Sequence, residues 1–142
     1  MVTEMYVLKK SAAKEFECDK PWACISINCP DDSKATISGV KRQGLLHLEF
    51  WDAEFARASF EPEHIFSEET ANKVWDFVEE IWEKAEVLML HCLMGQSRSA
   101  AVAAAISKVK YGTDQDFFDP PFTPNMMIYS KMLKVANERG MI

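Results

Sequence analysis

The stretch from Val87 to Tyr111 constrains the fold more than any other part of this sequence. It opens with a short, wholly apolar segment, Val87 to Leu90, which is typical of a buried strand. The turn H-C-L-M-G-Q-S-R-S follows, and the run A-A-V-A-A-A-I then indicates a helix that reaches about Tyr111 and stops at Gly112. A strand that passes through a tight turn into a helix is the unit from which parallel sheets are built, so this segment predicts an α/β fold.

The rest of the chain fits the same class. Further strands are predicted at Met5–Leu8, Trp22–Asn28 and Leu45–Phe50, and further helices at Glu68–Ala85 and Asn125–Arg139. Ser67 is a good N-cap for the first of these helices. Residues 34–43 show no clear pattern, and Gly44 is a candidate end of a short helix there. We expect one domain over residues 1–142, with a mainly parallel central sheet of about four to five strands flanked by helices.

Composition and charge exclude several classes of function. An apolar fraction of 48% is enough for a proper core, while a formal net charge of −6 counts against a nucleic-acid binder, which needs a basic face. No apolar stretch approaches the ~18–20 residues of a bilayer span, and the amino terminus does not resemble a signal peptide. Four cysteines occur without a C-x-x-C pair, so we expect reduced thiols, no zinc or other metal site, no membrane association and a cytoplasmic location.

The turn between the strand and the helix has the features of an anion-binding site. Consecutive backbone N–H groups at a helix N-terminus can curl around a tetrahedral oxyanion. A glycine in the turn permits a backbone angle that other residues resist, and an arginine fork can hold two phosphate oxygens. The predicted phosphate-binding residues are Leu93, Met94, Gly95, Gln96, Ser97 and Arg98.

The same turn would activate a nucleophile. Cys92 lies at the start of the turn, where the N–H groups and Arg98 favour the thiolate, which is the attacking form of cysteine. Ser99 could hydrogen-bond the sulfur and help it leave when an intermediate breaks down. His91 is expected to brace the loop through backbone hydrogen bonds rather than to act as a base. By average residue usage the whole pattern arises by chance in on the order of one chain in ten thousand of this length.

The run from His91 to Ser99 resembles the H-C-x-x-G-x-x-R-S signature of protein tyrosine phosphatases, especially the dual-specificity branch. The resemblance implies a single phosphatase catalytic domain that hydrolyses phosphate monoesters through a phosphocysteine, with no metal or cofactor. It implies phosphorylated proteins as substrates, bearing phosphotyrosine or phosphoserine and phosphothreonine. It also implies that phosphate, sulfate or vanadate can occupy the loop.

The resemblance also implies an acid roughly thirty to forty residues before the nucleophile, to protonate the leaving group. Asp52 follows the predicted strand Leu45–Phe50 and is the best match, although its distance along the chain requires residues 53–66 to be looped out. The competing candidates are Glu54, Asp31 and Asp32, and the simpler alternative is that Asp52 only caps a turn. The pair Pro124-Asn125 resembles a segment whose asparagine supports the active-site loops, or else Asn125 is an ordinary helix N-cap.

Several alternatives stay open at this point. The scaffold could instead serve RNA 5′ ends or small phosphorylated metabolites, or a phospho-binding module without turnover. The loop holds no lysine, which favours simple phosphoesters over highly charged phosphoinositides. Cys24 and Cys29 are expected to be core thiols. Asp114, Asp116 and Asp119 are expected to form a solvated loop, with cation binding as the alternative.

Overall fold

The structure is a computed structural model that describes residues 1–53 and 61–142. Glu54, one of the candidate acids, lies outside the described residues, as does half of the segment 53–66 that was expected to loop out after Asp52. Within the described residues, no helix is both long enough and apolar enough to cross a bilayer.

A four-stranded parallel sheet forms the centre of the protein. Its strands are β1 (Glu4–Lys9), β2 (Trp22–Asn28), β3 (Arg42–Glu49) and β4 (Val87–Cys92), in the spatial order β1-β4-β2-β3. Every neighbouring pair is parallel. The two central strands are buried along their whole length, which explains why their sequences are almost continuously apolar. The sheet confirms the predicted fold class.

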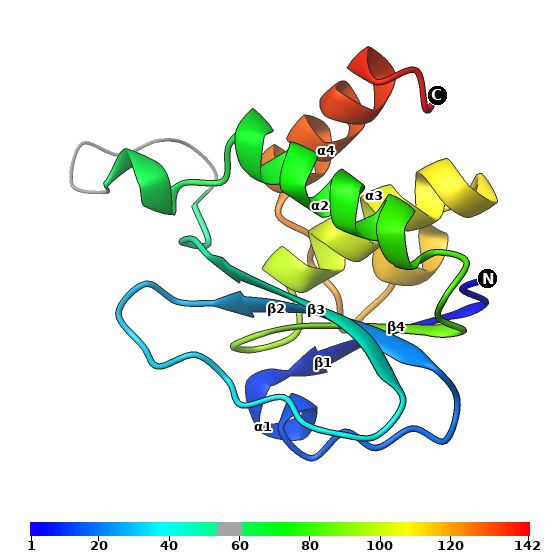
Figure 1. Cartoon of the computed structure of the whole chain (residues 1–142). Helices are drawn as coiled ribbons and strands as arrows, with labels where there is room; N and C mark the ends of the chain where they lie inside the picture. Colours follow the sequence, from blue (N-terminus) through cyan, green and yellow to red (C-terminus); the bar gives the residue numbers. More distant parts are fainter. Residues whose placement is uncertain (54–60) are drawn as a thin grey trace.

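Helices cover the two faces of the sheet unequally (Figure 1). One face carries α2 (Glu68–Ile81), α3 (Arg98–Tyr111) and α4 (Met126–Glu138). The other carries the single turn α1 (Lys10–Ala13) and an irregular segment whose Ala35 and Ile37 pack on Trp22 and Met89. The described residues also form two short 3-10 helices, η1 (Pro62–His64) and η2 (Gln115–Phe117).

The helix α3 is buried from Arg98 to Ser107, because its alanines allow close approach on all sides. It lies between the sheet and the other two long helices in the main core. A buried hydrogen bond of 3.0 Å from the Trp75 indole to the Met132 carbonyl joins α2 to α4. The residue that starts α3 is therefore held by packing on several sides, which matters for the site described below.

Most predicted boundaries agree with the structure to within a few residues, and Ser67 caps α2 by accepting a hydrogen bond from the Thr70 N–H. The prediction for Gly44 was wrong, because this glycine lies inside β3 and ends no helix. A Cβ at Gly44 would lie 3.0 Å from Ile81 and 3.1 Å from Phe77. The glycine therefore serves the close packing of β3 against α2, a use that a local sequence pattern does not reveal.

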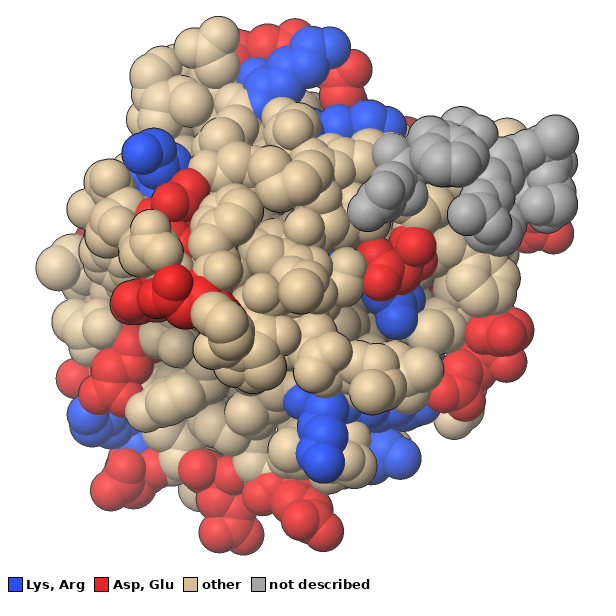
Figure 2. Space-filling view, turned by 180° about the vertical axis from the view of Figure 1, so that it is seen from behind, with Lys and Arg blue, Asp and Glu red and all other residues tan. Residues whose placement is uncertain are grey.

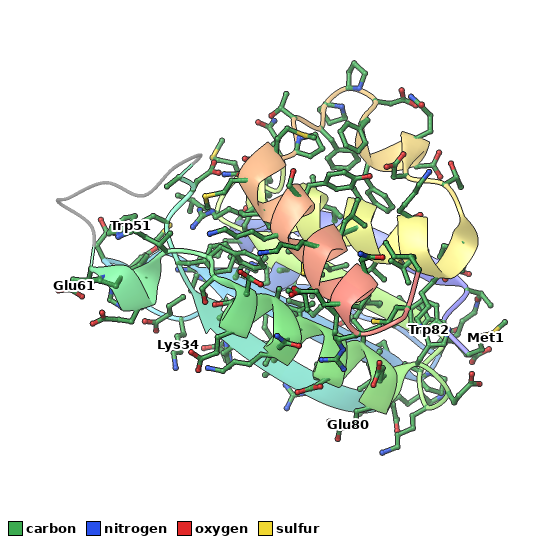
Figure 3. The ribbon with its side chains drawn as sticks, turned by 90° about the horizontal axis from the view of Figure 1, so that it is seen from above. Met1, Lys34, Trp51, Glu61, Glu80 and Trp82 are labelled. Atoms are coloured by element: carbon green, nitrogen blue, oxygen red, sulfur yellow. The ribbon has the colours of Figure 1, made fainter. Side chains whose placement is uncertain are left out.

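Parallel strands bring their carboxyl ends to one edge of the sheet, where ligands of open α/β sheets bind. Here β2 ends before Cys29, β3 ends before Phe50 and β4 ends at Cys92. Figure 3 shows Trp51 and Glu61 at this end of the molecule, while Met1 and Trp82 lie at the opposite end. The topology thus gathers residues that are far apart in sequence at the edge that carries Cys92.

Candidate active site

The loop of residues 93–97 connects β4 to α3, and its shape depends on Gly95. This residue has φ +67°, in the left-handed region. A Cβ added to it would lie 2.5 Å from the Leu8 carbonyl carbon and 2.6 Å from the Lys9 nitrogen. Only glycine satisfies both conditions, so the loop can press directly against the backbone where β1 ends.

Three carbonyl groups of the loop are tied to surrounding segments. Lys10 N–H donates to Leu93 at 3.1 Å, Thr123 N–H donates to Gln96 at 2.8 Å, and Asn125 N–H donates to Ser97 at 3.2 Å. The N–H groups of residues 93–97, in contrast, have no acceptor among residues 1–53 and 61–142. Successive backbone N–H groups that are free in one tight loop can bind an oxyanion together, so this arrangement is suited to the predicted phosphate site.

The N-terminus of α3 adds to this anion site. The helix has 14 residues, and the residue at its N-cap, Ser97, makes no capping hydrogen bond through its side chain. The positive end of the helix dipole is therefore left for another anionic or hydrogen-accepting group. Such a terminus behind a strand is the arrangement that was expected for residues 93–98.

Cys92 lies at the base of this loop and is only 2% exposed. Its Sγ is 3.0 Å from the Oγ of Ser99, so the hydroxyl can donate a hydrogen bond to a thiolate. The other cysteines have different surroundings. Burial raises the pKa of the Cys24 thiol to about 12, as suits an inert core residue. Cys29, expected to be a core thiol, is partly buried and accepts a hydrogen bond of 3.3 Å from Arg98 Nη2.

Arg98 is held from the side of the sheet. Its side chain is 6% exposed, and its Nη1 donates to the Phe50 carbonyl at 2.9 Å. Together with the contact to Cys29, this bond fixes the guanidinium between the ends of β2 and β3. Each of these two nitrogens, Nη1 and Nη2, carries a second N–H group, and phosphate binding by Arg98 stays a prediction.

Asp52 is hydrogen-bonded to the loop although it follows β3, an edge strand that β2 separates from β4. Its Oδ1 accepts hydrogen bonds of 2.8 Å from the Ser97 hydroxyl and of 2.8 Å from the Asn125 amide. The competing acid Asp32 instead pairs with Lys10 at 2.9 Å, and this hydrogen bond lowers its pKa. Neither Asp31 nor Asp32 bonds to residues 93–98 in the described structure. The geometry therefore favours Asp52 over these two competitors.

Asn125 combines the two roles that the sequence left open. Its Oδ1 accepts from the Ile128 N–H at 3.1 Å and so caps α4. Its Nδ2 donates to Asp52 and, at 3.0 Å, to the Ala53 carbonyl. Because the same residue also holds the Ser97 carbonyl through its N–H, it links α4, the loop and the segment after β3.

A buried polar chain supports His91 from β2. The His91 Nε2 lies 2.6 Å from the Ser26 Oγ, which itself accepts from Asn28 Nδ2 at 3.2 Å. The tautomer of the ring decides which of the two atoms donates in the contact between His91 and Ser26. Burial lowers the pKa of His91 to about 4, so the ring is neutral at pH 7. A backbone hydrogen bond with Cys92 opposes this lowering of the pKa, so the Ser26 side chain adds to the backbone contact that was expected for His91.

The aspartates near 114–119 have structural contacts. Asp114 accepts a hydrogen bond from the Tyr129 hydroxyl, and Asp119 accepts one of 2.8 Å from Gln115. No group of three or more His, Cys, Asp or Glu among the described residues is placed to hold a metal ion.

Gly95→Ala should disrupt the loop, because the added Cβ meets the β1 backbone in addition to the strained φ. We expect a loss in the free energy of unfolding on the order of 2 kcal/mol or more, with loss of tungstate binding. Gly112→Ala is the matched control, since Gly112 has φ +81° and nothing lies within 4 Å of its added Cβ. Urea unfolding measures both variants, and equal costs would show that the clash is absent.

His91 should make stability depend on pH. Its pKa is about 4 in the folded protein against 6.5 for a free histidine, so the unfolded chain binds more protons between these values. Stability should fall as the pH drops from about 6.5 to about 4, by on the order of 3 kcal/mol from this residue. Urea unfolding over this range should give a flatter pH dependence for His91→Gln. Parallel curves for the two proteins would contradict the assignment.

Comparison with known proteins connects this geometry to one group of solved structures. No protein-family model matches the sequence, and no curated protein matches it. Human DUSP28 matches with a TM-score of 0.59 and 14% identity, over 96% of this chain and 93% of that one.

Two further solved structures are similar to this chain. The human tyrosine phosphatase-like serine/threonine/tyrosine-interacting protein gives a TM-score of 0.59 with 15% identity, over 82% of this chain and 77% of that one. A mouse putative dual specificity phosphatase, solved with zinc tungstate, gives 0.58 with 16% identity, over 84% and 73%. The chain therefore has the fold of the dual-specificity phosphatases.

Proposed function

We propose that this chain is a cysteine-dependent phosphatase that hydrolyses phosphate monoesters through a phosphocysteine at Cys92. The observation that carries the proposal is the convergence of three groups on one loop. These groups are the N–H donors of residues 93–97 without acceptors in the described structure, the Cys92 sulfur 3.0 Å from Ser99, and Asp52 bonded to Ser97. Nucleophile, anion site and acid are all needed for this reaction. The first two are contiguous in the sequence, whereas the acid comes from the segment after β3.

In the first step the Cys92 thiolate attacks phosphorus, a P–S bond forms and the P–O bond to the organic group breaks. The N–H groups of the loop and Arg98 stabilise the charge on the phosphoryl oxygens. Asp52 gives a proton to the departing oxygen, which leaves as an alcohol or phenol. Because the Oδ1 of Asp52 already accepts two hydrogen bonds, the proton is carried by Oδ2.

In the second step the Asp52 carboxylate takes a proton from water, whose oxygen attacks phosphorus as the P–S bond breaks. Ser99 donates a hydrogen bond to the departing thiolate. Inorganic phosphate is released. The Cys92 thiolate and the protonated Asp52 are then ready for another cycle. The charge stabilisation in both steps comes from amide groups and Arg98, so the mechanism requires no metal ion or cofactor.

Phosphorylated protein segments are the substrates that we propose. The net charge of −6 counts against RNA 5′ ends, since a polyanionic substrate would be repelled. One protein of the same fold is described as phosphatase-like and interacting, so binding without turnover is the outcome against which activity must be tested. An acid in contact with the loop favours turnover.

Cys92→Ser should abolish hydrolysis of para-nitrophenyl phosphate measured in the presence of EDTA, because the hydroxyl is a far weaker nucleophile. The wild-type protein should be active under these conditions and inhibited by vanadate. Cys18→Ser is the matched control and should keep full activity, since Cys18 lies away from the loop. A folded wild-type protein that binds tungstate but shows no turnover would favour a binding module.

Asp52→Asn should slow turnover of an aryl phosphate by roughly 10²–10⁴, because the leaving oxygen loses its proton donor. The effect should grow as the leaving phenol becomes more basic, and the limb of the pH–rate profile that reports loss of the Asp52 proton should disappear. Asp31→Asn serves as the control and should change neither quantity. An Asp52→Asn protein with the wild-type rate and pH profile would refute the acid assignment.

A further inference from the structure

A cleft of about 610 Å³ opens directly beside the candidate active-site loop. Asp52, Gln96 and Ser97 line it on the side of the loop. Its remaining lining is mostly apolar, and we call these residues the apolar shelf: Met94, Phe118, Phe122, Pro124 and Met126. Asp52 is the one charged residue in the described lining, so the cleft offers little attraction to additional phosphate groups.

Two large apolar side chains of the apolar shelf are exposed to solvent, which is unfavourable. Met94 is 65% exposed and Met126 is 49% exposed, which is high for large apolar side chains. They come from the loop and from the first residue of α4, and they line the same cleft. Methionine side chains adapt to varied apolar surfaces and pack well on aromatic rings. Such a surface is suited to binding an uncharged organic group.

The shelf is fixed to the loop rather than loosely placed. The 2.8 Å bond from the Thr123 N–H to Gln96 and the 3.2 Å bond from the Asn125 N–H to Ser97 join its chain segment to the loop backbone. Phe118 packs edge-on against Tyr129 with ring centroids 5.3 Å apart, and Phe122 lies 6.0 Å from Phe117. The distance between bound phosphate and shelf is therefore largely set before a ligand arrives, which favours selective binding.

The proposed chemistry identifies what occupies the shelf. The leaving oxygen must lie between the loop-bound phosphorus and Asp52, so the organic group attached to it projects into the cleft that Asp52 lines. Figure 2 shows one face of the molecule with a broad uncharged region that is interrupted by a few acidic and basic side chains. The volume of the cleft is large enough for an aromatic ring with a neighbouring side chain, and the apolar shelf offers one side of it to an apolar neighbour.

We propose that the apolar shelf binds the side chains that flank a phosphotyrosine, and that the preferred substrates are phosphotyrosine segments with apolar neighbours. This inference rests on the proposed function, because it assumes that the loop holds the phosphate. It adds a selection rule that the loop alone does not provide. Singly phosphorylated, locally apolar segments are favoured over ligands with several phosphates.

Binding to the Cys92→Ser protein tests the proposal without turnover. Two phosphotyrosine peptides are compared by fluorescence anisotropy, identical except that leucine flanks the phosphotyrosine on both sides in one and serine in the other. The leucine peptide should bind roughly tenfold more tightly, as expected for burial of one or two apolar side chains. Because both peptides carry the same charge, the ratio of the dissociation constants isolates the apolar contribution.

The variants locate the preference on the shelf. Met126→Gln should reduce the ratio to within about twofold of one, whereas Met126→Leu should retain it. Met126 is exposed at the start of α4, so neither change should prevent folding. Val40→Gln is the matched control, because Val40 is 78% exposed and lines a separate cavity at the amino-terminal end of β1 and β4. It should leave the ratio unchanged.

Several outcomes would overturn the inference. Equal affinities for the two peptides would do so, as would a preference that survives both Met126→Gln and Phe122→Ser. Tighter binding to vesicles that contain a phosphatidylinositol phosphate than to either peptide would assign the cleft to lipid headgroups.

Turnover is measured separately, as hydrolysis of para-nitrophenyl phosphate by the wild-type protein. If the protein hydrolyses para-nitrophenyl phosphate but the ratio of the two dissociation constants is near one, only the proposed role of the apolar shelf is refuted. A ratio near ten without hydrolysis refutes the phosphatase proposal and leaves the shelf as part of a phosphotyrosine-binding site.

Discussion

The close approach of Gly95 to the backbone at the end of β1 is the constraint on which the candidate site depends. With no Cβ in the way, the loop after β4 can turn tightly and direct its carbonyl groups to Lys10, Thr123 and Asn125. The N–H groups of residues 93–97 are left without acceptors in the described structure, at the N-terminus of α3. The proposed anion binding therefore depends on how the backbone is anchored, and Cys92 lies at the base of that arrangement.

Buried polar contacts extend this anchoring through the sheet. His91, Ser26 and Asn28 are all at most 3% exposed and are joined by hydrogen bonds, so their burial costs less than it would for unpaired groups. Asn28 also accepts from the Ala35 N–H and donates to the Leu48 carbonyl, and it thereby connects β2 to β3 and to the irregular segment after Cys29. The position of Cys92, the proposed nucleophile, is thus coupled through His91 to β2, β3 and the irregular segment. Asn125 and Asp52 provide the corresponding links on the side of α4.

Much of this could be predicted from the sequence, because it depends on local patterns. The strand, loop and helix around Cys92 are contiguous, and apolar periodicity located the four strands and the three long helices to within a few residues. The role of Gly44 was misjudged and the contacts of Ser26, Asn28 and Cys29 were missed, because they depend on which strands are neighbours. The register that places Ser26 beside His91 follows from the order β1-β4-β2-β3, which local patterns do not specify. The bond between Ser97 and Asp52 joins residues 45 positions apart and was equally inaccessible.

The central claim is that Cys92 becomes covalently phosphorylated while the loop holds the phosphoryl group. The most direct test is rapid acid quenching of the protein during turnover of an aryl phosphate, followed by mass spectrometry of the peptide that contains Cys92. Asp52→Asn protein should make the intermediate easier to observe, because the step that hydrolyses it also requires Asp52. One phosphoryl group is expected on the Cys92 sulfur. Turnover with no phosphorylated intermediate, or with phosphate on a different residue, would contradict it.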